Sequence, residues 1–90
     1  MPYKYTLIAE ISDLNESRGH AYLELIEKSE DDMVMARSRA TIWARTYRML
    51  KPYFESATGH VLRTGLKILV VVNVEFHEVY GLSLNIVDID

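Results

Sequence analysis

Apolar and polar residues alternate along three segments in the first half of the chain. A two-residue period is typical of strands that bury one face and expose the other. In the second segment, for example, Leu23 and Leu25 would face a core while Tyr22 and Glu24 face outward. The pattern predicts strands over residues 5–12, 21–27 and 33–43, separated by a polar loop, "NESRGH", and a charged turn, "KSEDD".

The third of these strands has an unusual outer face. Its predicted core side consists of small and apolar residues, namely Val34, Ala36, Ala40 and Ile42. In "RSRATIWAR", residues 37–45, the opposite side carries Arg37, Arg39, Thr41 and Trp43. The only tryptophan of the chain therefore lies among arginines, on the side predicted to face solvent.

The period changes after the third strand. Apolar residues recur at the spacing of a helix, at Tyr47, Leu50 and Phe54. Pro52 lies within this segment, so we expect a break or kink near Lys51 and a second short helical turn that ends at Gly59. Two β-branched segments, 66–76 and 82–89, then predict two further strands, the first of them buried on both sides or curved round a barrel.

Three strands, a helix and two strands are the plan of the oligonucleotide/oligosaccharide-binding (OB) fold. We therefore predict an all-β structure with one helix, a five-stranded barrel in which the helix lies between strands 3 and 4. Residues 1–90 are expected to form a single domain, because 90 residues suffice for only one core. In this fold the usual ligand face is formed by strands 2 and 3 and the adjoining loops.

The charges of the chain are segregated. The formal net charge is −3, which taken alone argues against nucleic acid as a ligand. Residues 33–54, however, contain five cations and no acid, a local charge of +5, whereas the rest of the chain sums to −8. A phosphate backbone responds to charge within about one Debye length, roughly 8 Å at physiological salt, so the local segment is the better guide.

Cations spaced along a strand beside exposed rings are the groups that single-stranded nucleic acid requires. Arginines hold phosphates, and aromatic ring faces stack on unpaired bases. The alternative interpretation is structural, since a tryptophan at a strand end often packs against a core or rim, and exposed arginines are often only solvated. The predicted nucleic-acid-binding residues are Tyr22, Arg37, Arg39, Thr41, Trp43, Arg45, Arg48 and Lys51.

Other kinds of site find little support in the sequence. The chain has no cysteine, which excludes disulfides and thiolate metal sites and fits a cytoplasmic protein. Its three histidines lie far apart, and nucleophile triads and glycine-rich phosphate loops are absent, so we expect no catalytic residue, metal or cofactor. One alternative is that Glu10, Asp13, Asp88 and Asp90 gather at strand ends around a divalent cation. No apolar run approaches the roughly 20 residues of a membrane span, and no secretory signal is visible.

Three segments share their order and spacing with a known family. They are "AEISDLNESRGHAYLELIEK" (9–28), "SRATIWARTYRMLKPYF" (38–54) and "GLKILVVVNVEFHEVYGLSLNIVDID" (65–90). Together they resemble the N-terminal domain of the exodeoxyribonuclease VII large subunit, whose framework contains "GEIS", "GH.YF.L", an apolar–aromatic pair and "V.V...Y...G.YQL.V". The corresponding stretches here are "AEIS" (9–12), "GHAYLEL" (19–25), "IW" (42–43) and "VNVEFHEVYGLSLNIV" (72–87).

The resemblance implies a barrel that binds single-stranded DNA and feeds it to a nuclease region further along a bacterial protein. It also implies that residues 1–90 are an excised domain without activity of its own, and that the small subunits bind elsewhere in the parent chain. Trp43 matches the aromatic residue at the end of the family's third strand. The chain departs from the family at two places. Val79–Tyr80 stands where a proline–arginine pair is frequent, so that Tyr80 could stack on a base in place of the arginine, and Asn85 stands where an apolar residue is expected. An RNA-binding barrel and a protein-docking barrel remain alternatives.

Overall fold

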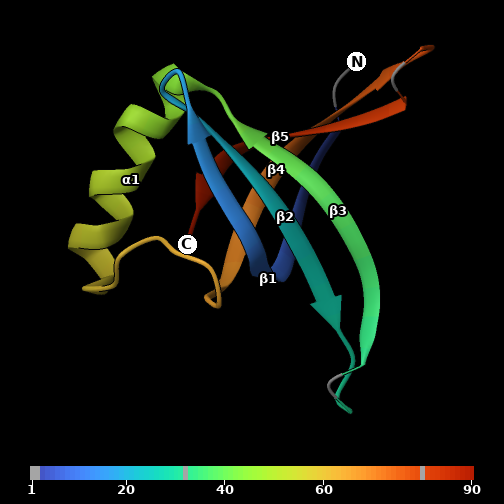
Figure 1. Ribbon diagram of the computed structural model, residues 1–90, viewed down its shortest axis with the longest axis horizontal. Helices are drawn as coiled ribbons and strands as arrows, with labels where there is room; N and C mark the ends of the chain where they lie inside the picture. Colours follow the sequence, from blue (N-terminus) through green and yellow to red (C-terminus); the bar gives the residue numbers. More distant parts are fainter. Residues whose placement is uncertain (1–2, 32, 80) are drawn as a thin grey trace.

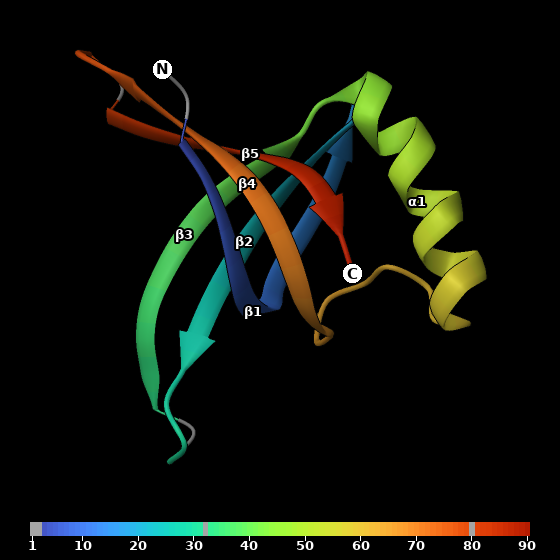
Figure 2. The same ribbon diagram turned by 180° about the vertical axis from the view of Figure 1, so that it is seen from behind.

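The computed structural model describes residues 3–31, 33–79 and 81–90, with only the backbone described at Tyr3, Val34, Met35 and His77. The elements are β1 (Tyr3–Ser17), β2 (His20–Lys28), β3 (Val34–Ile42), α1 (Ala44–Thr58), β4 (Lys67–His77) and β5 (Gly81–Ile89). The strands close a barrel in the order β1-β2-β3-β5-β4, with α1 at its side (Figures 1 and 2). The predicted five-stranded barrel with its helix between the third and fourth strands is confirmed.

β1 is long enough to pair with two neighbours, and this closes one side of the barrel. Its first half, residues 3–10, pairs with β4, and its second half, residues 10–17, pairs with β2. A bulge between Ile11 and Asp13 lies near the junction of the two halves. Such a bulge bends a strand and increases its twist, which lets one strand turn from one neighbour to the other.

The seam between β3 and β5 is short. Among the described residues the two strands meet in parallel at two register pairs, Ala40 with Leu84 and Thr41 with Asn85. β3 pairs with β2 along its whole length, and the part of this hairpin that lies before the seam with β5 projects beyond the barrel at the lower end of Figure 1. Ala36 was predicted to lie in the core but is exposed, because its part of the hairpin has no core beneath it. Ala40 is buried, as predicted.

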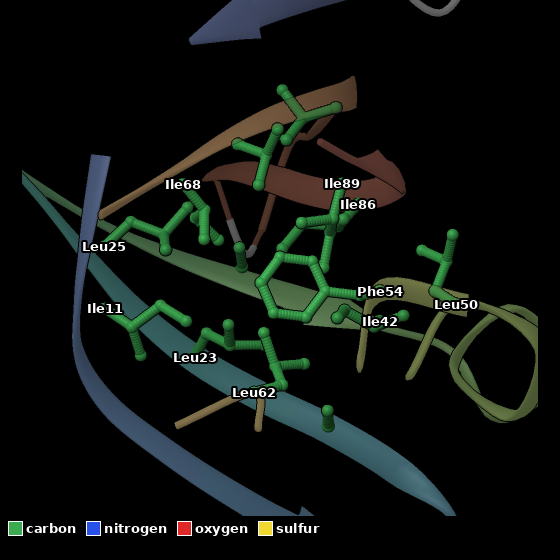
Figure 3. Packing of buried hydrophobic residues seen from close by; sticks show 14 of the residues in the cluster. Ile11, Leu23, Leu25, Ile42, Leu50, Phe54, Leu62, Ile68, Ile86 and Ile89 are labelled. Atoms are coloured by element: carbon green, nitrogen blue, oxygen red, sulfur yellow. The ribbon is translucent and has the colours of Figure 1, made fainter. Parts of the chain in front are cut away.

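The core fills the barrel and the space beneath α1. The largest fully buried side chains come from strands: Ile11, Leu25, Ile42, Val70, Val72 and Ile86. α1 contributes Tyr47, Leu50 and Phe54, the three residues whose spacing predicted the helix. In Figure 3 the ring of Phe54 lies in the middle of the cluster, among side chains of several strands. The helix therefore completes the hydrophobic core rather than resting on its surface.

β1 and β2 are joined by a tighter turn than the sequence predicts. The expected loop "NESRGH" is wrong, because β1 continues to Ser17 and only Arg18 and Gly19 form the turn. Both turn residues have positive φ, 54° and 84°. This is the conformation of a two-residue hairpin turn whose twist matches that of its strands. The turn is packed against the start of α1, since a Cβ atom at Gly19 would lie 3.4 Å from that of Ala44.

α1 is continuous from Ala44 to Thr58, so the predicted break near Lys51 into a first helix and a second short helical turn is wrong. The helix runs through Pro52 and ends at Gly59, as predicted, where φ is 73° and the N–H donates to the Glu55 carbonyl at 2.9 Å. Pro52 removes one backbone hydrogen bond, to the carbonyl of Arg48. Because Pro52 lies on the exposed side of the helix, that carbonyl can be hydrated instead, while the buried side of the helix stays anchored in the core.

Candidate nucleic-acid interface

The outer surfaces of β1, β2 and β3 form one continuous sheet face across the front of the barrel in Figure 1. The strand register arranges its residues in two rows, Asn15–Tyr22–Thr41 and Asp13–Glu24–Arg39. The first row is polar and has the ring of Tyr22 at its centre. The second row has acidic side chains on β1 and β2 and a basic side chain on β3. We call the surface made by these six residues the β1–β3 face.

Trp43 lies at the edge of the β1–β3 face, where β3 ends and α1 begins. It is the N-cap residue of α1 rather than the last residue of β3, and its side chain is 49% exposed. The indole Nε1–H donates to Oδ1 of Asn85 on β5 at 2.8 Å. The ring of His20 lies edge-on to the indole, with 5.1 Å between centroids. These two contacts hold the indole in place while about half of it stays open to solvent.

His20 links Trp43 to Tyr22. Its ring lies 6.2 Å from that of Tyr22, centroid to centroid, again in an edge contact. Its Nδ1 accepts a hydrogen bond from the backbone N–H of Ala44 at 2.8 Å. Trp43 makes no side-chain cap to α1, so His20 supplies an acceptor that the first turn of the helix needs. Tyr22, His20 and Trp43 thus form a continuous series of rings, which we call the aromatic row.

Two of the five cations among the predicted nucleic-acid-binding residues form ion pairs with acids of β2 and β1. Arg37 Nη1 lies 3.0 Å from Glu24 Oε1, and Lys51 Nζ lies 3.3 Å from Glu16 Oε1. Within the described part of the chain the other three cations form no ion pair, and they are Arg39, Arg45 and Arg48. The positive charge available to a ligand is therefore smaller than the +5 of the local sequence.

Hydrogen bonds keep both partner carboxylates ionised. The hydroxyl of Ser12 donates to Glu24 Oε1 at 2.9 Å, and this bond together with the ion pair lowers the pKa of Glu24. The hydroxyl of Tyr47 donates to Glu16 Oε1 at 2.5 Å, and this bond together with the ion pair lowers the pKa of Glu16. Burial, followed by the hydrogen bond to Glu16, raises the pKa of Tyr47 well above its ordinary value. Tyr47 therefore stays protonated at neutral pH and donates its hydroxyl proton to Glu16.

Two hollows have Arg39 in common in their linings. The first, of about 330 Å³, opens on the β1–β3 face and is lined by Asp13, Asn15, Tyr22, Leu23, Glu24, Arg39, Ala40 and Thr41. The second, of about 360 Å³, lies where β3 and β5 separate and is lined by Arg37, Ser38, Arg39, Leu82 and Leu84. Arg39 can therefore reach a ligand that occupies either hollow.

The structure places the predicted site residues in two groups. Those on the strands are Tyr22, Arg39 and Thr41 of the β1–β3 face, and Arg37, which lies further along β3 toward the turn to β2. The remaining three recur at every third position of α1, at Arg45, Arg48 and Lys51. Residues three apart are neighbours on a helix, so this second group follows one side of α1 away from Trp43. Tyr80, the further candidate for stacking, lies outside the described residues.

Sequence reasoning missed His20 and Asn85. By spacing, His20 is an isolated histidine expected in a loop, and Asn85 interrupts the apolar pattern of the last strand. Asn85 is only 9% exposed, and a buried amide requires hydrogen-bond partners. The amide of Asn85 within an apolar strand was thus a signal in the sequence that a hydrogen-bond partner faces it. That this partner is Trp43 could be known only from the fold.

The metal site considered in the sequence is not assembled in the described residues. Within residues 3–31, 33–79 and 81–90, no three His, Asp or Glu side chains lie close enough to hold a metal ion. The divalent-cation site considered for Glu10, Asp13, Asp88 and Asp90 is therefore not formed, and Glu10 pairs with Lys28 at 2.8 Å instead. In the same residues no helix combines the length and the apolar character that crossing a membrane requires.

Comparisons with known proteins identify the family of the chain. The family model described as an OB-fold nucleic acid binding domain matches residues 1–90. The exodeoxyribonuclease 7 large subunit of Deinococcus radiodurans is 42% identical over 86 residues, which cover 90% of this chain and 20% of that protein. The chain thus spans about a fifth of the length of that relative. No solved structure matches. The chain belongs to the family of OB-fold nucleic-acid-binding domains.

Proposed function

We propose that this chain binds single-stranded DNA and presents it to the nuclease region of an exodeoxyribonuclease VII large subunit. The observation that carries the proposal is the aromatic row, in which the half-exposed indole of Trp43 is held by Asn85 and His20. Rings that are already fixed lose little side-chain freedom when bases stack on them. Arg39, which forms no ion pair with the described residues, lies on the same face in the row next to that of Tyr22 and is the cation that we assign to a phosphate of the bound strand.

The similarity to a protein named as an exodeoxyribonuclease large subunit supports DNA as the ligand. We assign cleavage, and the contacts to small subunits, to parts of a longer cytoplasmic protein beyond this barrel. The barrel then contributes binding alone and uses no cofactor. In an assay with Mg²⁺ and a labelled single strand, the isolated chain is expected to release no shortened products, and accumulation of such products would contradict this division of roles.

The binding experiment uses Trp43 as its own probe, because it is the only tryptophan of the chain. The chain is titrated at low salt with a mixed-sequence single strand of about 15 nucleotides, near the upper end of the site size of one OB fold. We expect the single strand to quench the indole emission, and added salt to reverse the quenching, since phosphate contacts release counterions. Duplex DNA of the same sequence is expected to give little quenching, because its bases are already stacked.

The same titration separates the two alternatives. A matched RNA strand that quenches more strongly than DNA would favour an RNA-binding barrel, since the 2′-hydroxyl is the main difference between the two strands. A protein-docking barrel would show no response to any oligonucleotide, together with self-association through the β1–β3 face. No quenching by single-stranded DNA at low salt would overturn the proposed function.

Glu24→Gln is expected to strengthen binding of single-stranded DNA about 2- to 5-fold at low salt. The change removes a negative charge from the β1–β3 face and releases Arg37 from its ion pair, so that Arg37 becomes available to phosphate. The fold should tolerate the change, because an exposed ion pair contributes little to stability. The measurement is the dissociation constant of a labelled single strand by fluorescence anisotropy at low and at high salt.

The matched control is Glu27→Gln, which removes the same charge from the same strand at an exposed position outside the β1–β3 face. It should change the affinity less than Glu24→Gln does. Equal gains in the two variants would mean that only net charge matters. A weaker affinity in Glu24→Gln would show that Arg37 needs its acidic partner to be held in position.

A further inference from the structure

We propose that the hollow beside Tyr22 is a base pocket that favours bases with an exocyclic amino group over thymine and uracil, with Asp13 as the residue that determines this preference. The inference rests on the proposed binding of single-stranded DNA and adds a base preference at one position. The hollow has a volume of about 330 Å³ and contains a ring, a cation and several hydrogen-bonding groups in its lining. It thus offers more than the flat stacking surface that sequence-independent binding requires.

Charge is divided across the β1–β3 face. Glu24 is paired with Arg37, so the charges without an ion pair on this face, among the described residues, are Asp13 on β1 and Arg39 on β3. Phosphates are attracted to Arg39 and repelled by Asp13. The backbone of a bound strand is therefore expected to follow β3. Its bases then point across Tyr22 toward β1, where the edge of a base meets Asp13.

The β1 side of the hollow presents mainly hydrogen-bond acceptors. The Asn15 amide nitrogen donates to Oδ2 of Asp13 at 3.0 Å, which fixes the two side chains relative to each other. The acceptors that this bond leaves available are Oδ1 of Asp13 and Oδ1 of Asn15, and the donor that it leaves on this pair is the second N–H of the Asn15 amide. A base edge that meets the carboxylate of Asp13 must therefore bring a donor.

The bases differ in the donors they bring. Cytosine, adenine and guanine each carry an exocyclic amino group, and carboxylates accept hydrogen bonds from the amino group of cytosine in other nucleic-acid complexes. Thymine and uracil have a carbonyl oxygen where cytosine has its amino group, and this oxygen would face the carboxylate of Asp13. Stacking on Tyr22 distinguishes cytosine from uracil only weakly, so hydrogen bonding at this edge would set the preference.

The test compares oligodeoxycytidine, oligodeoxyuridine and oligothymidine of equal length at pH 7.5, by competition against a labelled mixed-sequence strand. The wild-type chain is expected to bind the cytosine strand about 5-fold more tightly than the uracil strand, the lower end of what one hydrogen-bonded base edge contributes. The uracil and thymine strands should bind alike, because they share the carbonyl and differ only in a methyl group. In Asp13→Asn the new amide can donate to that carbonyl, so the ratio should fall to about 1.

Glu30→Gln in the turn between β2 and β3 is the control for net charge. It removes one negative charge at an exposed position away from the hollow and should leave the ratio as in the wild type. Equal binding of all three strands by the wild-type chain would overturn the base preference while leaving the proposed function intact. If the uracil strand binds as tightly as the cytosine strand while the thymine strand binds weakly, the pocket excludes the methyl group, and the proposed preference for an amino group is overturned. An unchanged ratio of cytosine to uracil affinity in Asp13→Asn would also overturn it. If the wild-type chain binds no single strand, the proposed function fails and this inference with it.

Discussion

Replacing Trp43 with alanine is expected to weaken binding of single-stranded DNA about 5- to 150-fold, which corresponds to the roughly 1–3 kcal/mol that one stacked base contributes. The indole is the largest exposed ring of the aromatic row, and its N–H is already bonded to Asn85, so its faces and outer edge are what a ligand meets. Because the variant has lost the intrinsic probe, affinity is measured by anisotropy of a labelled strand.

The matched control for this variant is Tyr53→Ala. Tyr53 is also an exposed aromatic residue, 65% accessible, but it lies on α1 outside the aromatic row. Its removal should leave the affinity within about 2-fold of the wild type, since surface substitutions away from a site rarely matter. The fold of Trp43→Ala needs a separate check by circular dichroism, because Asn85 loses its donor. An unchanged affinity in a folded Trp43→Ala variant would contradict the proposed stacking role.

A third variant, Trp43→Phe, separates the ring from its anchor. Phenylalanine retains an aromatic face but cannot donate to Asn85, so the ring is no longer held at the seam between β3 and β5. We expect an affinity between those of the wild type and Trp43→Ala. An affinity equal to that of the wild type would show that the hydrogen bond to Asn85 is unnecessary for binding.

The barrel could be predicted from the sequence because each strand carries its own signal. Inward residues such as Leu23, Leu25 and Ile42 alternate with polar ones, and burial of apolar area is enough to decide which face is inside. The extent of β1 could not be predicted in the same way. Its second half is polar in sequence, and it is a strand because β2 pairs with it, which is a property of the fold and not of the segment.

The ion pairs and hydrogen bonds of the site were harder to predict from the sequence than the residues that form the site. Arg37 and Lys51 looked free in a segment without acids, but their partners come from β2 and β1, 13 and 35 positions away. The bond from Trp43 to Asn85 spans 42 positions. A local charge count therefore overestimates the cations available to a ligand whenever neighbouring strands carry acids at matching register.

Phe54→Ala is expected to lower the free energy of unfolding by about 3–5 kcal/mol, the usual cost of removing a buried phenylalanine. The ring is 5% exposed and lies in the middle of the core, so its removal leaves a cavity among the strand side chains. A chain of 90 residues has a total stability of about 5–13 kcal/mol, so the loss is a large part of it. Urea unfolding followed by far-ultraviolet circular dichroism measures the change.

Tyr53→Ala again supplies the control, since it removes an adjacent aromatic side chain that is exposed, and it should change stability by no more than about 0.5 kcal/mol. Similar losses in the two variants would mean that α1 is only loosely packed and that Phe54 does not anchor it. A loss below about 1 kcal/mol for Phe54→Ala would have the same meaning.

The Phe54 variant also tests what holds the aromatic row in place. Trp43 is the N-cap residue of α1, yet its indole contacts Asn85 of β5 and His20 of β2, which are strand residues. If these strand contacts position the ring, folded Phe54→Ala protein should bind single-stranded DNA with wild-type affinity at low temperature. Saturating DNA should then recover part of the lost stability, about 2.7 kcal/mol at 100-fold excess over the dissociation constant. A weaker affinity in the fully folded variant would instead show that the anchoring of α1 extends to Trp43, and that the helix is part of the binding site.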